Sequence, residues 1–283
     1  TAGFDIDDIE PVATMPEDFD AFWAKVLSDN NKLEMLPQLE LVPEKCTPKV
    51  NVYSASFQNQ RKGCRMYGTM CVPADLKPGD KLPAILIVPG AGCRARTGFY
   101  AVAEKGFVTL EVGIHHIPTV MDDEIYAQLK AGMMAEYQFY NMDDKDKYVY
   151  KGIYAGCARA VDFLAGLDFV DPERIGITGG SQGGALTLAA ASLDRRVAGA
   201  APYVPFLGDF RDYFDIVDWP GSKFFAEAKR LGISIDEMFA TLTYFDLKNL
   251  TERIECPVLM GFGLQDVICP PHTNFASYNS IVA

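Results

Sequence analysis

The sequence predicts an α/β fold with a mainly parallel, doubly wound sheet and helices on both faces. Short apolar runs that suit buried strands alternate with longer segments whose apolar residues recur at helical spacing. Residues 174–186 give the clearest example, because a strand, a glycine-rich turn and a small-residue helix follow one another there. The chain has 283 residues, 49% of them hydrophobic, which is enough for one large domain with a substantial core. We therefore expect a single domain over residues 1–283.

The first half of the chain is expected to open with a helix and to continue into four strands. The helix begins near Pro16, with acidic residues in its first turn and aromatic residues on one face. The strands are expected at 50–58, 64–73, 82–89 and 107–113, with a short helix near 98–105. The first two strands flank a turn at 59–63 and predict a hairpin-like pair. A polar, aromatic-rich loop is expected after the fourth strand, up to about residue 147.

The second half is expected to continue the alternation of helices and strands. A helix is expected at 148–167, then the strand and helix around 174–186, then strands at 198–204 and 257–262. Between the last two strands, residues 208–250 are rich in Phe and Asp and predict a helical excursion or cap. Short helical patterns occur within it at 222–231 and 235–242.

The turn at residues 179–183 reads Gly-Gly-Ser-Gln-Gly and matches the pattern Gly-x-Ser-x-Gly. A serine between a strand and a helix is held in a strained conformation, and the residues two before and two after it must be small. Such a turn presents the Ser181 hydroxyl at the carboxyl end of the strand, beside the backbone N–H of Gln182, which can stabilise an oxyanion. A glycine-rich loop in another α/β protein is the alternative. The strand before the turn and the helix after it favour a nucleophile.

A serine nucleophile requires a general base and a carboxylate that orients the base. Asp266 follows the last expected strand, where the acid of such a triad belongs, and a turn-capping role is its alternative. Asp209 follows the preceding strand and is the fallback acid. The turn after residues 82–89 offers a second oxyanion donor, the backbone N–H of Ala91.

The chain contains three histidines. His272 lies only six residues after Asp266, at an expected helix start, which is too close for the triad base. His115 and His116 lie at the carboxyl end of a strand, on the active-site side of the sheet. They are candidate pocket residues, and loop histidines without chemistry are the alternative.

The composition disfavours several classes of partner and cofactor. The net charge is -12 and no long basic run occurs, which disfavours nucleic-acid and anionic-membrane binding. No apolar run approaches the roughly 20 residues of a membrane span. The seven cysteines lack paired spacing and predict small core residues rather than a metal site or a disulfide framework. We expect no metal and no cofactor. The first residue is Thr1, so the periplasmic, secreted and cytoplasmic compartments all remain open.

The whole chain resembles the acetyl xylan esterase / cephalosporin C deacetylase family, carbohydrate esterase family seven. The resemblance is carried by Asp18-Phe19-Asp20-x-Phe22-Trp23, Tyr148-x-Tyr150, Gly-Gly-Ser-Gln-Gly-Gly at 179–184 and Cys269-Pro-Pro. It implies an α/β-hydrolase that removes acetyl groups from xylo-oligosaccharides and similar small acetate esters, without metal or cofactor and as a homo-oligomer. It also implies Ser181 as nucleophile, Asp266 as triad acid and the N–H of Gln182 as an oxyanion donor.

The chain departs from the family pattern at three places. Gly-Ile-His-His-Ile-Pro at 113–118 replaces the usual Arg-Gly-Gln, and Ala91 replaces the usual Tyr of the oxyanion turn. The histidine expected beyond Asn279 is absent, for which truncation before the catalytic His is one account and loss of activity another. Two other functions stay open: a different serine hydrolase, such as a peptidase or a bulky-acyl esterase, and a non-catalytic glycan-binding pseudo-hydrolase.

Overall fold

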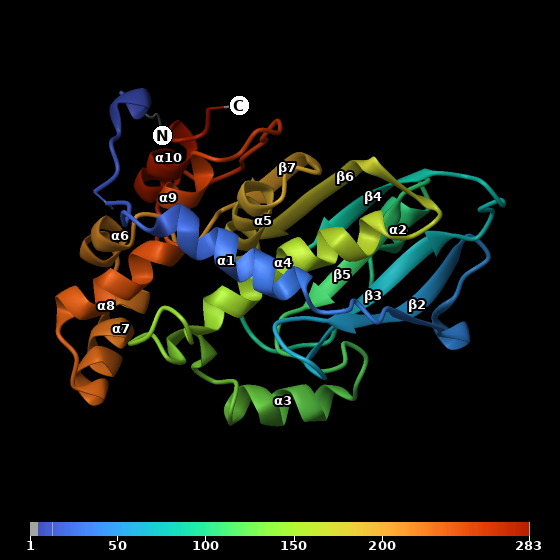
Figure 1. The fold of residues 1–283 in the computed structure, drawn as a ribbon, viewed down its shortest axis with the longest axis horizontal. Helices are drawn as coiled ribbons and strands as arrows, with labels where there is room; N and C mark the ends of the chain where they lie inside the picture. The colour runs from blue at the N-terminus through green and yellow to red at the C-terminus, as the bar shows by residue number, and fades with distance from the viewer. Residues whose placement is uncertain (1–4, 13, 283) are drawn as a thin grey trace.

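The computed structural model describes residues 5–12 and 14–282, and a mixed sheet lies at its centre (Figure 1). The strands run in the order β1-β2-β3-β5-β4-β6-β7. Their bounds are Gln38–Leu41, Val50–Gln58, Arg65–Pro73, Leu82–Ile87, Val108–Gly113, Val170–Gly180 and Val197–Tyr203 for β1 to β7.

Two kinds of pairing meet in this sheet. Strands β5, β4, β6 and β7 are parallel, whereas β1, β2 and β3 pair antiparallel and β3 joins β5 antiparallel. The expected hairpin is therefore confirmed as β2–β3. The carboxyl ends of the four parallel strands meet at one edge of the sheet, which is where ligands bind in open α/β sheets. The α/β-hydrolase class expected from the sequence is confirmed.

Helices cover both faces of the sheet (Figure 1). Met70 and Val72 of β3 face the large core under α1, α4 and α5, whereas Cys71 between them faces a smaller cluster with Ala103 of α2. Successive side chains of a strand point to opposite faces, so α2 lies across the sheet from the other three. The helices are α1 Phe19–Asn31, α2 Tyr100–Ala103, α3 Asp123–Ala131, α4 Val149–Ala165, α5 Gln182–Leu193, α6 Phe210–Ile216, α7 Asp218–Leu231, α8 Ile235–Leu242, α9 Leu247–Thr251 and α10 Pro271–Asn279.

The excursion at 208–250 is confirmed as helical and forms α6 to α9. Its core is aromatic: Phe214 stacks on Phe224 with ring centroids 5.0 Å apart, and Phe239 packs against Phe214 at 5.8 Å. Helix α8 begins with a capping box between Ser234 and Glu237. Among the helices of the described residues, none has both the length and the hydrophobicity needed to cross a bilayer.

Three elements differ from the expectation. The loop before residue 147 contains α3 and the 3-10 helix η3 Tyr137–Phe139; α3 buries only Tyr126, so its apolar periodicity is weak. Strand β1 was not expected, because all four of its residues are exposed and no alternation marks it. The predicted strand 257–262 forms only the isolated bridges Ala200↔Val258 and Tyr203↔Gly261. Pro257 in this segment and Pro202 in β7 lack the N–H that a regular ladder needs.

The turn between β6 and α5 has the strained geometry that the sequence predicts. The Ser181 backbone adopts φ 57° and ψ -123°, a conformation that residues other than glycine rarely adopt. A Cβ on Gly179 or on Gly183 would lie 2.5 Å from the carbonyl oxygen of Val88, which directly follows β4. Only glycine therefore lets β6, α5 and the end of β4 meet at this point.

We predict that Gly179→Ala destabilises the fold and that Gly176→Ala does not. The added methyl at 179 meets backbone atoms that cannot move aside, which costs about 1–3 kcal/mol or more. Gly176 lies on the same strand, and a Cβ there would find its nearest neighbour at 3.6 Å, an ordinary contact. Urea unfolding of both variants measures the difference. Equal stability of the two variants would contradict the close approach.

Candidate active site

Ser181 lies at the carboxyl edge of the sheet and is fixed through its backbone. Its N–H donates to the carbonyl of Tyr203 at 3.1 Å, and its carbonyl accepts the N–H of Phe206 at 3.2 Å. These bonds join the turn to the end of β7. The Ser181 side chain lies beside the thiol of Cys269, which is 3% exposed. Burial raises the pKa of Cys269 to about 11, so the thiol stays protonated at neutral pH.

Asp266 lies in the loop that leads to α10, and Cys269 connects it to Ser181. One carboxylate oxygen, Oδ1, accepts the backbone N–H of Ile268 and of Cys269, both at 2.8 Å. Asp266 thus caps a turn, as the alternative interpretation held. Its second oxygen makes no hydrogen bond within the described part of the chain, so that oxygen remains able to accept a further donor. Cys269 bonds Asp266 through its N–H, and its thiol lies beside the Ser181 side chain, which brings the two candidates into one site.

Asp209, the fallback acid, is fully buried in the excursion. Its Oδ2 accepts the N–H of Val12 at 2.8 Å, and its own N–H donates to Asp246. The Asp209 carboxylate thus holds the N-terminal segment on the excursion. This position favours Asp266 over Asp209 as the acid.

Each of the three histidines is held by partners other than Ser181. His272, at the start of α10 as expected, contacts Asp212 of α6 through Nε2 at 2.8 Å. His115 Nε2 lies 3.4 Å from the carbonyl oxygen of Gly92, and burial lowers the pKa of His115 to about 4. His116 contacts the Arg65 carbonyl through Nδ1 at 3.2 Å. No histidine in residues 5–12 or 14–282 makes a hydrogen bond with Ser181.

The side chain of Gln182 is fully buried and connects the two turns that carry the expected oxyanion donors. Its Oε1 accepts the hydroxyls of Tyr137 at 2.6 Å and Tyr150 at 2.7 Å, and its Nε2 donates to the Pro89 carbonyl at 3.3 Å. The Tyr137 hydroxyl also accepts the N–H of Gly92 at 3.4 Å. These bonds tie the residue after Ser181 to the turn Pro89–Gly92, which contains Ala91. The network is closed and buried, so it fixes the two turns relative to each other.

His115 also helps to fix the turn Pro89–Gly92. Its ring meets the Tyr137 ring edge to face, with centroids 4.5 Å apart. With a pKa of about 4 the imidazole is neutral near pH 7, and its Nε2–H donates to the Gly92 carbonyl in the matching tautomer. His115 is therefore a supporting residue of the oxyanion turn rather than a base near Ser181.

Sequence reasoning missed Cys269, Tyr137 and the side chain of Gln182 as parts of this site. Cys269 and Gln182 both occur in motifs that carry the resemblance, which was the available signal. Tyr137 lies in a segment that the sequence assigned to a loop. Taken together, the site holds a serine at a strained elbow, two backbone donors in adjoining turns and a carboxylate with one unused oxygen, which is an arrangement suited to acyl transfer.

The sequence of the chain matches the family model described as acetyl xylan esterase (AXE1) over residues 5–283. Acetyl esterase Axe7A of Xylanibacter ruminicola is 33% identical over 288 residues, which cover 99% of this chain and 64% of that protein. The chain thus spans 64% of the length of this curated relative.

Two solved structures are similar over nearly the whole chain. An acetyl xylan esterase from Paenibacillus sp. R4 has a TM-score of 0.85 and 28% identity, with 98% of this chain and 89% of that chain covered. Acetyl xylan esterase 1 from Thermoanaerobacterium sp. JW/SL YS485 has a TM-score of 0.81 and 25% identity, with 98% and 87% covered.

We predict that the Tyr150 hydroxyl matters for turnover and that the Tyr148 hydroxyl does not. Tyr150→Phe removes one of the two donors to Gln182 and loosens the oxyanion turns, so kcat should fall on the order of tenfold while KM changes little. The Tyr148 hydroxyl is buried and has no hydrogen-bond partner within the described residues, so Tyr148→Phe is the matched control. Steady-state kinetics on p-nitrophenyl acetate provides the comparison. An equal loss in both variants would show that packing, not the hydrogen bond, matters.

Proposed function

The chain belongs to the acetyl xylan esterase family, and from this premise we propose that it is a serine esterase acting on acetylated xylan. Its substrates would be acetylated xylo-oligosaccharides and similar small acetate esters. The observation that carries the proposal is the strained Ser181 elbow with Asp266 joined to it through Cys269, in a chain that matches the family over residues 5–283.

In the proposed reaction the Ser181 hydroxyl attacks the acetyl carbonyl carbon. The carbonyl oxygen becomes an oxyanion, which the backbone N–H groups of Gln182 and Ala91 stabilise. The sugar alcohol leaves with a proton, and water then attacks the acetyl-serine to release acetate. The serine proton must pass to a general base, and the unused oxygen of Asp266 would orient an imidazole in that role. We assign none of His115, His116 and His272 as that base, because each is engaged elsewhere.

The cavity beside Asp266 supports a substrate of sugar size. It has a volume of about 830 Å³ and lies between the excursion and the Asp266 loop. Its walls are mostly apolar, with Ile216 and Trp219 from the excursion and Ile268 from the loop. Phe206, next to the Ser181 turn, stacks on Trp219 with centroids 6.0 Å apart. An apolar wall with few polar groups is typical of small-molecule sites.

We also propose that the protein forms a homo-oligomer. The edge strand β1 exposes Leu39 and Leu41, at 38% and 46%. Apolar side chains on an unpaired sheet edge are typical of a surface that another chain covers.

We predict that Ser181→Ala folds normally and loses esterase activity. Without the nucleophile, only binding and oxyanion stabilisation remain, so kcat should fall at least about a thousand-fold. Ser28→Ala, an exposed position on α1, is the control and should keep full activity. The measurement is hydrolysis of p-nitrophenyl acetate. Turnover of the Ser181→Ala variant at the wild-type rate would reject Ser181 as the nucleophile, and an inactive wild type would favour a non-catalytic glycan-binding protein.

We predict a preference for acetate over longer acyl groups. Ser181 contacts the buried Cys269 directly, which leaves little room for an acyl chain beside the nucleophile. Each extra methylene in a tight pocket is worth roughly 1–3 kcal/mol, so butyrate should be at least about tenfold poorer in kcat/KM. A series of p-nitrophenyl acetate, butyrate and hexanoate measures the effect. Equal or better kcat/KM on hexanoate would favour a bulky-acyl esterase instead.

A further inference from the structure

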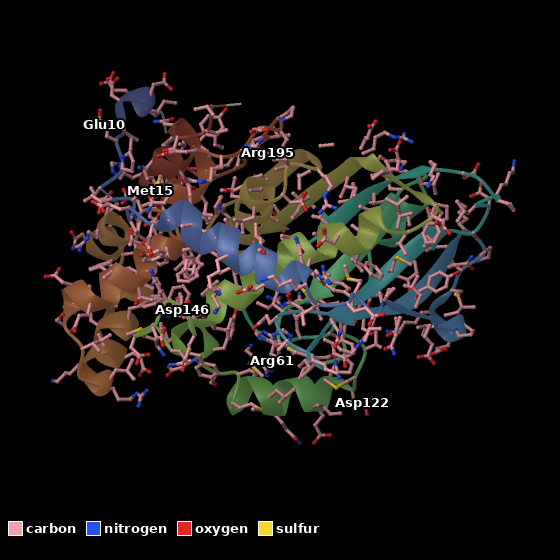
Figure 2. All side chains as sticks on the ribbon, in the orientation of Figure 1. Glu10, Met15, Arg61, Asp122, Asp146 and Arg195 are labelled. Atoms are coloured by element: carbon pink, nitrogen blue, oxygen red, sulfur yellow. The ribbon has the colours of Figure 1, made fainter. Side chains whose placement is uncertain are left out.

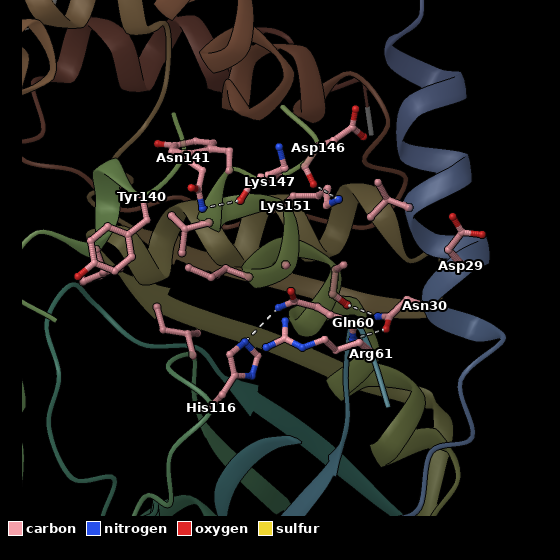
Figure 3. A pocket seen from close by; sticks show the side chains of 18 of the residues that line it. Asp29, Asn30, Gln60, Arg61, His116, Tyr140, Asn141, Asp146, Lys147 and Lys151 are labelled. Carbon is pink, nitrogen blue, oxygen red and sulfur yellow. Dashed lines mark hydrogen bonds between the residues drawn. The ribbon is translucent and has the colours of Figure 1, made fainter. Parts of the chain in front are cut away.

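A second cavity, of about 590 Å³, is shown from close by in Figure 3. It lies between α1, α4, the turn that joins β2 to β3, and the segment that follows β5. Tyr137 lines this cavity and hydrogen-bonds Gln182 of the active site. Its lining shares no residue with the cavity beside Asp266, so the two cavities are separate.

The second cavity is positively charged, although the chain as a whole carries a net charge of -12. Its basic lining residues are Lys25, Arg61, Lys147 and Lys151, and its acidic ones are Asp29 and Asp146. Lys25 pairs with Asp29, and Lys147 pairs with Asp144 outside the cavity lining. Arg61 makes no ion pair or hydrogen bond through its side chain in the part of the chain that the structure describes. A positive cavity with an unpaired guanidinium is suited to an anionic ligand.

The residues beside Arg61 are held in strained backbone conformations. Gln60 adopts φ 66° and His116 adopts φ 57°, and their side chains meet at 3.0 Å between Gln60 Nε2 and His116 Nε2. The amide can only donate there, so His116 accepts at Nε2 and its Nδ1–H donates to the Arg65 carbonyl. The imidazole is therefore neutral, and Arg61 carries the charge. Two adjoining strained residues are typical of a ligand site, where the surrounding structure maintains the strain.

The surrounding structure holds this turn rigidly. The N–H of Gln60 donates to Asn30 Oδ1 at 2.8 Å, and Asn30 Nδ2 donates to Asn59 Oδ1 at 3.0 Å. Asn30 and Asn59 are 5% and 1% exposed and also donate to the carbonyls of Ala155 and Gly152, so two buried amides join the turn to α1 and α4. A Cβ on Gly152 of α4 would lie 2.0 Å from Gln60 Nε2, so the Gln60 amide packs directly on the backbone of α4. The backbone of the turn that carries Arg61 is therefore fixed before a ligand binds.

The opposite side of the cavity offers groups that suit a sugar ring. Figure 3 shows Gln60, Arg61 and His116 along one side, and Tyr140, Asn141 and Lys147 along the other. Tyr140 is 43% exposed, so part of its ring is open to contact. The Asn141 Nδ2 group donates to the Lys147 carbonyl, which leaves its Oδ1 as an acceptor for a hydroxyl. An exposed aromatic ring beside amide groups can contact the apolar face of a sugar and bond its hydroxyls.

We propose that this cavity binds a carboxylated sugar of about the size of a hexuronate, with its carboxylate on Arg61 and its ring beside Tyr140 and Asn141. The choice of a sugar rests on the proposed function of the chain, whereas the choice of a carboxylate rests on the charges of the cavity. Arg61 and Asp146 mark the site in the whole molecule (Figure 2). A ligand there would lie against Tyr137, which supports the oxyanion turn from the other side.

The test is isothermal titration calorimetry of the full chain with D-glucuronate, D-glucose and inorganic phosphate. Glucuronate and glucose differ only at C6, so the pair isolates the carboxylate. Arg61→Gln removes the unpaired charge, and Lys62→Gln removes the neighbouring charge on the same turn, outside the cavity lining. We expect glucuronate to bind at least tenfold more tightly than glucose and than phosphate. Arg61→Gln should weaken glucuronate binding at least tenfold and Lys62→Gln less than twofold, because Lys62 does not line the cavity.

Two further variants test the sugar contact and the independence of this cavity from catalysis. Tyr140→Ser should weaken the binding of glucuronate and leave the binding of phosphate unchanged, because only the sugar contacts the Tyr140 ring. Ser181→Ala should bind glucuronate as the wild type does, so the binding result does not depend on whether the chain is an esterase. Absence of glucuronate binding, or an equal loss in Arg61→Gln and Lys62→Gln, overturns the site. Glucose binding as tight as glucuronate overturns the role of the charge, and phosphate binding as tight as glucuronate overturns the recognition of a sugar.

Discussion

The close contact between the Ser181 turn and the Val88 carbonyl is the constraint on which the rest of the active site depends. Gly179 and Gly183 leave no room for a side chain, so β6, α5 and the end of β4 are brought together at backbone distance. This contact gives Ser181 its strained backbone and places the Pro89–Gly92 turn beside the residue after the nucleophile. The two expected oxyanion donors therefore come from turns whose spacing the backbone itself sets.

The Gln182 side chain completes that geometry with hydrogen bonds. A fully buried amide is costly unless its donors and acceptors are satisfied, and here two tyrosine hydroxyls and a carbonyl satisfy it. The bonds join four segments: the elbow, the turn after β4, the η3 segment with Tyr137 and the helix α4 with Tyr150. Removal of one hydroxyl leaves a buried acceptor with fewer partners, which affects position more than binding. The network thus explains why an amide, rather than an apolar side chain, occupies the position after Ser181.

The periodicity of apolar residues predicted the elements that bury one apolar face. It failed for elements that have no such face. The hairpin β2–β3, the helix α4 and the excursion were predicted because their apolar residues recur over long stretches. Strand β1 is exposed at every residue, and α3 buries only Tyr126, so neither has a face for a pattern to reveal. Ser181 and Asp266 could be placed because strand ends fix their positions along the chain. Cys269 and Tyr137 could not, because their roles arise from contacts between segments far apart in the sequence.

The two consecutive histidines after β5 show how one departure from the family pattern supports two sites. His115 lies against Tyr137 and the Gly92 carbonyl, on the active-site side, whereas His116 bonds Gln60 in the second cavity. The φ of 57° at His116 turns the chain so that the two side chains serve different partners. Both imidazoles are neutral, His115 because burial lowers its pKa to about 4 and His116 because it must accept from the Gln60 amide. Neither ring therefore adds charge beside the oxyanion donors or beside Arg61. A ligand on Arg61 and a transition state at Ser181 would then be separated by His115 and Tyr137, which line the second cavity and support the oxyanion turn.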